Sequence, residues 1–232
     1  MLRGGGAAAT RRPRFAYNPA AGRKGSHVAR NSDNDAHAHE RRLIARARAG
    51  EEAALRELIE AHQDRLYAFI RRMVHHHHDA EEVCQEAFLK AFASLKSFSP
   101  QYRFSTWLFT IAYRVALNHL RRKKAVTGDV DFARLPQLES TSAASLVESA
   151  ETARLRGKVW EMVDRLSPPQ RAALVLFYRH EYSCQDIARI LDVPVATVKS
   201  HLHRARHRLR DLLLEEVRDG GAVDRNISAL GG

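Results

Sequence analysis

The chain has 232 residues, enough for one large helical domain or two small ones, and carries a net charge of +11. This excess of cations indicates an anionic partner, of which nucleic acid is the natural candidate. The sequence contains no apolar run of about 18 residues, as a membrane span requires, and we expect no secretory signal because the basic N-terminus lacks an apolar segment. The two cysteines, Cys84 and Cys184, stand far apart, so we expect buried thiols in a reducing cytoplasm rather than a disulfide.

Residues 1–39 are rich in Gly, Ala, Arg and Asn without a hydrophobic period, so we expect a disordered extension. From residue 40 to 124 apolar residues recur at steps of three and four, the period of an α-helix. Gly50 separates the first two predicted helices, and Ser99-Pro100 precedes the last one. The sequence therefore predicts a first helical domain over residues 40–124.

A second helical pattern covers residues 150–217. Between the two patterns, residues 125–149 are rich in Gly, Asp, Pro, Ser and Thr and read as a linker, and we expect residues 218–232 to form a frayed tail. The predicted fold class is all-α, with two small helical domains joined by a flexible linker and a helix-turn-helix in the second domain.

The helix-turn-helix is predicted over residues 183–210. Ser183 and Asp186 form a capping box for its first helix, and Pro194 suits the first turn of its second helix. In that second helix the apolar residues share one stripe, and no carboxylate occurs between Ala196 and Arg210. Such a helix suits the major groove of DNA, although an ordinary amphipathic surface helix is the alternative. The predicted DNA-reading residues are Lys199, Ser200, His203, Arg204, Arg206 and His207.

Four segments in order along the chain carry a family resemblance. They are residues 79–92 (DAEEVCQEAFLKAF), 104–112 (FSTWLFTIA), 166–171 (LSPPQR) and 197–200 (TVKS). Together they resemble the extracytoplasmic-function (ECF) sigma factors of bacterial RNA polymerase. The resemblance implies that the first domain binds the clamp helices of the core polymerase and recognises the minus-ten promoter element. It also implies that the second domain reads the minus-thirty-five element.

An acidic surface on this basic chain fits a basic partner helix, although acids at a helix start also complement the helix dipole. The predicted core-polymerase-binding residues are Asp79, Glu81, Glu82, Gln85 and Glu86. Aromatic side chains beside donors and cations suit melted single-stranded DNA. The predicted minus-ten residues are Trp107, Tyr113, Arg114, Asn118, Arg121 and Arg122, although the spacing of Trp107 also suits a core position.

The chain departs from the family pattern at three positions, two of them among the predicted minus-ten residues. Arg114 stands where the family often has Asn, and Asn118 where it often has Asp, so the captured base does not follow from the resemblance. His201 replaces a common Arg, which lowers phosphate affinity at neutral pH.

The four histidines His75 to His78 invite a metal hypothesis, but their spacing favours a solvated loop without a metal. We therefore expect a sigma factor without enzymatic activity, cofactor or metal, whose partners are core RNA polymerase and promoter DNA; an anti-sigma factor is left open as a further partner. A helix-turn-helix regulator acting without polymerase is one alternative, and a metal-dependent enzyme built around the histidines and Cys84 is the other.

Overall fold

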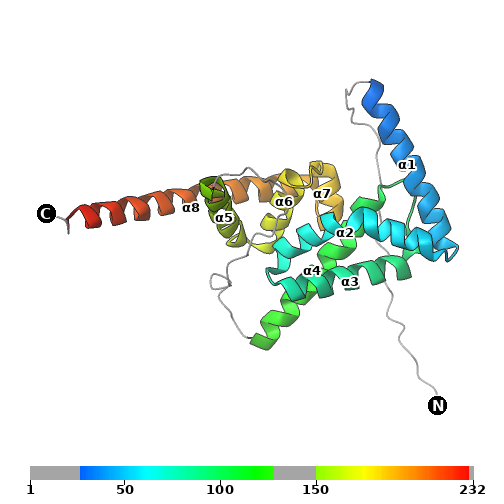
Figure 1. Cartoon of the computed structure of the whole chain (residues 1–232), viewed down its shortest axis with the longest axis horizontal. Helices are drawn as coiled ribbons and strands as arrows, with labels where there is room; N and C mark the ends of the chain where they lie inside the picture. The colour runs from blue at the N-terminus through cyan, green and yellow to red at the C-terminus, as the bar shows by residue number, and fades with distance from the viewer. Residues whose placement is uncertain (1–26, 128–149, 230–232) are drawn as a thin grey trace, which may run out of the picture. The chain divides into compact units, whose positions relative to one another are not determined.

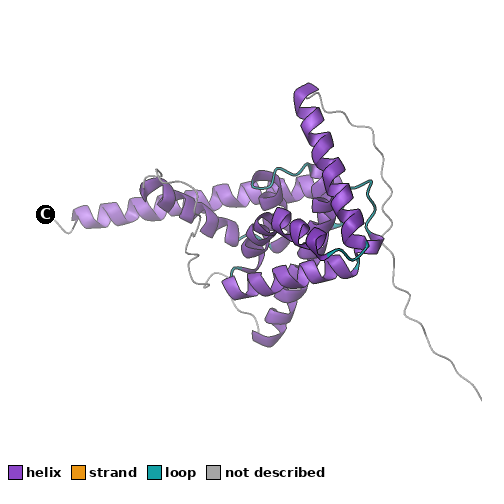
Figure 2. Ribbon diagram, turned by 45° about the vertical axis from the view of Figure 1, so that its right-hand side comes forward, coloured by secondary structure: helices purple, strands orange, loops and turns teal. Residues whose placement is uncertain are grey.

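The computed structural model describes residues 27–127 and 150–229, and all regular structure within these ranges is helical (Figure 2). The predicted all-α fold class is confirmed. The elements along the chain (Figure 1) are α1 His27–Arg48, α2 Glu52–Val74, α3 His77–Ala93, the short 3-10 helix η1 Leu95–Ser97, α4 Phe104–Thr127, α5 Ala150–Asp164, α6 Pro168–Tyr178, α7 Cys184–Leu191 and α8 Val195–Ala229.

Helices α2, α3 and α4 pack against one another through the apolar stripes that the sequence predicts. Phe69, Val83 and Leu108, one from each helix, are fully buried. Gly50 joins α1 to α2 with φ of +90°, a backbone conformation that glycine adopts without a Cβ clash. Helix α1 begins at His27, so the prediction that residues 1–39 are disordered is wrong for residues 27–39. Residues 1–26 lie outside the described ranges.

Helices α5 to α8 form the second domain, whose helix-turn-helix begins as predicted. The Ser183 hydroxyl accepts a hydrogen bond from the Asp186 N–H at 3.1 Å, which caps α7. Pro194 lies just before α8, one position earlier than predicted, and its carbonyl accepts the Thr197 N–H at 2.9 Å. Helix α8 continues to Ala229, so residues 218–229 are helical where a frayed tail is predicted.

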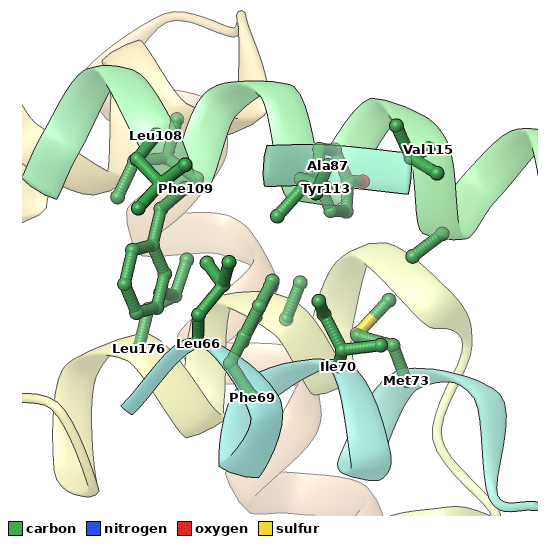
Figure 3. Packing of buried hydrophobic residues seen from close by; sticks show 14 of the residues in the cluster. Leu66, Phe69, Ile70, Met73, Ala87, Leu108, Phe109, Tyr113, Val115 and Leu176 are labelled. Carbon is green, nitrogen blue, oxygen red and sulfur yellow. The ribbon is translucent and has the colours of Figure 1, made fainter. Parts of the chain in front are cut away.

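The two domains share one continuous hydrophobic core. Leu66 of α2, Phe109 of α4 and Leu176 of α6 are each at most 1% exposed and lie together in this core (Figure 3). The sequence does not predict this contact, because an apolar stripe shows which side of a helix is buried but not which domain covers it. The linker predicted over residues 125–149 falls mostly on residues 128–149, which lie outside the described part of the chain.

Candidate functional site

The DNA-reading face predicted for α8 lies on the surface. Val198 and Ala205 are fully buried and Leu202 is nearly so, which anchors one side of α8 in the core of the second domain. The opposite side is a row of cations and hydrogen-bond donors, with His203 and His207 in contact at 3.0 Å between their Nε2 atoms. All six residues predicted to read DNA are exposed: Lys199, Ser200, His203, Arg204, Arg206 and His207. The rotation of the helix therefore matches the sequence prediction.

The predicted polymerase-binding face of α3 divides into free and paired groups. Glu82 and Gln85 are exposed and make no hydrogen bond or ion pair with other described side chains. Glu86 instead pairs with Lys90 at 2.5 Å and with Arg122 at 3.5 Å. The hydrogen bond from Lys90, with the Arg122 charge, outweighs the opposing effect of burial and lowers the pKa of Glu86.

Two other predicted acids also have intramolecular partners. Asp79 Oδ2 accepts a hydrogen bond from Lys123 at 2.7 Å and lies 3.2 Å from His119 Nε2. Burial acts to raise the pKa of Asp79, but these two contacts outweigh it, so the pKa lies below its usual range. Glu81 lies 3.2 Å from His77 within the first turns of α3. Asp79 therefore ties α3 to α4, a structural role that the sequence reasoning did not assign.

Leu89 belongs to the same face of α3 and was missed from sequence. Its side chain is 71% exposed, the highest value among the large apolar residues that the structure describes. It follows Glu82 and Gln85 at steps of three and four, so the three side chains form one exposed stripe. The signal was present in the sequence, because Leu89 lies off the apolar stripe that faces the core.

The predicted minus-ten residues on α4 fall into two groups. Arg114, Asn118, Arg121 and Arg122 are exposed. Trp107 is half-buried against Phe98 and Phe104, with ring centroids 5.2 and 5.6 Å away.

Tyr113 of the same set does not lie on the surface. Its side chain is buried, and burial raises the pKa of its phenol to about 12. A buried ring offers no face for a nucleobase, so the prediction that Tyr113 contacts melted DNA is not supported by this structure.

The histidine run is not the solvated loop that the sequence predicts. His75 ends α2 and is buried, at 7% exposure, whereas His77 and His78 already belong to α3 and are exposed. Within the described ranges no three His, Cys, Asp or Glu side chains converge on a common point where a metal ion could bind. In the same part of the chain, no helix has the length and hydropathy to cross a membrane.

Comparison with known proteins assigns both domains. Residues 58–126 match the family model of sigma-70 region 2, and residues 156–209 match that of sigma-70 region 4. The chain is 30% identical to the ECF RNA polymerase sigma factor SigW of Bacillus subtilis over 181 residues, which cover 75% of this chain and 96% of that protein. The chain belongs to the ECF sigma factors. The RNA polymerase sigma-H factor of Pseudomonas aeruginosa is 33% identical over 186 residues, 78% of this chain and 96% of that one.

The fold agrees with solved sigma factor structures. The sigma factor RpoE of Bartonella quintana, solved in complex with the anti-sigma factor NepR, superposes with a TM-score of 0.56 at 26% identity. The match covers 68% of this chain and 95% of that one. As a sigma factor, this chain acts in transcription initiation. We refer below to its first domain as the region 2 domain and to its second as the region 4 domain.

Proposed function

We propose that the region 4 domain reads the minus-thirty-five element through α8 and that the region 2 domain binds core polymerase through α3 and the minus-ten element through α4. The exposed face of α8 is the observation that carries the proposal, because its cations and donors all point away from the buried stripe. Side chains of this kind contact base edges and phosphates in the major groove.

The stripe of Glu82, Gln85 and Leu89 on α3 supports the polymerase contact. An apolar side chain that is 71% exposed, flanked by an unpaired carboxylate, suits a partner helix that carries both apolar and basic residues. Glu86 and Asp79 are weaker candidates than the sequence suggested, because forming a new ion pair would require breaking an existing one.

The region 2 domain offers Asn118 and Arg121 to the melted strand, whereas Arg114 and Arg122 must first leave their ion pairs with Asp192 and Glu86. Trp107 is partly accessible and Tyr113 is buried, so cations and an amide, rather than stacked aromatic rings, dominate this surface. We further propose that the chain has no enzymatic activity of its own, needs no cofactor and works in the cytoplasm, where polymerase and template are. An anti-sigma factor, the partner in the RpoE structure, is a candidate regulator.

Run-off transcription on genomic fragments tests this function. Core RNA polymerase mixed with the chain is expected to yield discrete transcripts that neither component yields alone. Sequence-specific footprints by the isolated chain, with no dependence on polymerase, would instead support a regulator that acts alone.

Charge reversal on α3 tests the polymerase contact. Glu82→Lys combined with Leu89→Ala is expected to weaken capture of core polymerase about tenfold or more, because like charges would meet and an apolar contact would be lost. Glu60→Lys on α2 is the matched control, since Glu60 is exposed and lies outside the proposed surface. Equal capture of the double variant and the control in a pull-down would show that this stripe does not face polymerase.

A further inference from the structure

Two histidines of the DNA-reading helix meet at the outer nitrogens of their rings. His203 and His207 lie one turn apart on α8, and their Nε2 atoms are 3.0 Å from each other. The ring centres are 4.2 Å apart, farther than the two nitrogens, so the rings lean together at their nitrogen ends. Both side chains are exposed, and two histidines at this spacing on a helix can bind one metal ion together.

The backbone holds this pair in place before any ion binds. Ala205 lies between the two histidines in sequence and is fully buried, and Leu202, one residue before His203, is 4% exposed. These two side chains fix this part of α8 in the core of the region 4 domain. An ion that binds both imidazoles therefore has to order only the two side chains, which keeps the entropy cost of binding low.

The separation of the two nitrogens selects the kind of metal. Imidazole nitrogens lie about 2.0–2.1 Å from a bound transition metal. Two nitrogens 3.0 Å apart then subtend about 95° at the ion, close to the right angle between neighbouring ligands in square-planar or octahedral coordination. The tetrahedral geometry that zinc prefers would need the nitrogens about 3.4 Å apart. The pair therefore suits copper(II) or nickel(II) better than zinc.

The charges around the pair leave room for a further cation. Three neighbouring arginines already have partners: Arg206 donates to the Leu202 carbonyl at 3.2 Å, Arg210 pairs with Asp211 at 3.3 Å and Arg208 lies 4.0 Å from Glu215. Asp211 also follows His207 by one helical turn, so its carboxylate attracts an ion at the pair. Lys199 and Arg204 repel the ion, but water and salt screen this repulsion at an exposed site.

We propose that His203 and His207 form a binding site for copper(II) or nickel(II), and that a bound ion prevents α8 from reading the minus-thirty-five element. The second half of this inference rests on the proposed function of the helix. A nitrogen that coordinates a metal can no longer donate or accept a hydrogen bond at a base edge. The ion is an effector and not a structural metal, because neither histidine belongs to the hydrophobic core.

The ion should separate two components of DNA binding. Its two positive charges add to the cations of α8, so attraction to phosphates, which does not depend on sequence, should not fall. Base readout should fall, because both imidazoles are occupied. Loss of specific reading with retention of non-specific binding is the expected signature of this site, whereas unfolding caused by the metal would reduce both.

Metal titration of the free chain tests the site without DNA. The untagged full chain is titrated calorimetrically with NiCl2 and, separately, with ZnCl2, and nickel is expected to bind more tightly. His203→Ala and His207→Ala should each weaken nickel binding about tenfold or more, and the double variant little further, because the two imidazoles act as one chelate. His78→Ala is the matched control, since it removes one imidazole that is 97% exposed and lies on α3.

Run-off transcription tests the coupling to DNA reading. Core polymerase with the wild-type chain is compared with and without NiCl2, on promoters that carry or lack the minus-thirty-five element. Nickel should lower the advantage of the promoter with the element roughly fivefold or more, and leave the affinity for unrelated duplex undiminished in fluorescence anisotropy. The His203→Ala/His207→Ala variant should not respond to nickel in this way, which separates the site from effects of nickel on polymerase.

Two results would overturn the proposal. Equal nickel affinity in His203→Ala and in the His78→Ala control would show that the pair does not bind the ion. Nickel bound at the pair with unchanged promoter selectivity would show that the ion and the base do not compete. Failure of transcription without any metal would count against the proposed function, whereas the calorimetric result needs no DNA and still decides whether the metal site exists.

Discussion

His180 is a buried histidine whose neighbours all disfavour its charged form. Burial lowers its pKa to about 4, and the nearby cations Arg65 and Arg179 add to the effect. Its ring lies against Phe69 and Phe109, and Nε2 has no hydrogen-bond partner among the described residues. The folded chain therefore contains a neutral imidazole at neutral pH, and the imidazole gains its proton only around pH 4.

This histidine gives the fold a predictable response to acid. In the unfolded chain His180 takes up a proton near its ordinary pKa of about 6.5, whereas the folded pKa is about 4. Stability is thus complete above about pH 6.5 and falls as the pH drops toward 4. Between pH 7.5 and pH 5 we expect His180 to account for a loss of about 1–2 kcal/mol in the free energy of unfolding. Urea denaturation at several pH values measures this loss.

The matched variant for this measurement is His180→Phe. A phenyl ring fits among the same aromatic neighbours and has no proton to gain, so the variant should lose less stability than the wild type over that pH interval. If both proteins lose the same amount, a different group is responsible for the acid response.

The burial of single residues was harder to predict from the sequence than the positions of the helices. Tyr113 and His75 are polar enough to suggest the surface, yet both are buried, because a neighbouring element covers them. Leu89 shows the opposite error, because an apolar side chain that suggests the core is 71% exposed. Burial by a distant part of the chain leaves no trace in local periodicity.

At the scale of elements, α8 carries its core residues on one side and the proposed DNA-reading residues on the other. Leu202→Ala is expected to reduce the stability of the region 4 domain by about 2–5 kcal/mol, because its 4% exposed side chain fills the core. Arg204→Ala should leave thermal stability within about 0.5 kcal/mol of the wild type, since the side chain is exposed.

The effect of Arg204→Ala should appear in promoter use instead. Arg204→Ala should weaken use of the minus-thirty-five element by about 1–3 kcal/mol, which run-off transcription on promoters with and without that element measures. If Leu202→Ala and Arg204→Ala have similar melting temperatures, the assignment of Leu202 to the buried side of α8 and of Arg204 to its exposed side is wrong.

Element boundaries followed from the sequence wherever a local signal marked them. Gly50, the Ser183 cap and the break before α8 all lie where punctuation residues predicted them, within one position. The start of α1 and the end of α8 did not, because the sequence there lacks both a strong apolar period and a cap. The DNA-reading face of α8 was predictable because charge and apolar residues alternate with a clear helical period.

At the scale of the whole molecule, the net charge of +11 governs binding to nucleic acid. Isolated chain is expected to bind duplex DNA weakly and without sequence preference, with an affinity that falls steeply between about 50 and 200 mM salt. Fluorescence anisotropy with unrelated duplexes checks this expectation. A salt-independent affinity would mean that phosphate contacts are not the main source of binding.

Arg114 has two partners that exclude each other. Its guanidinium pairs with Asp192 at 3.2 Å, and we propose above that the same side chain meets the melted promoter strand. Binding of that strand and formation of the ion pair are therefore reciprocal: each weakens the other by the same factor. A short single strand carrying the minus-ten sequence would then compete with Asp192 for one guanidinium, and so be sensed in the second domain before α8 has met any DNA.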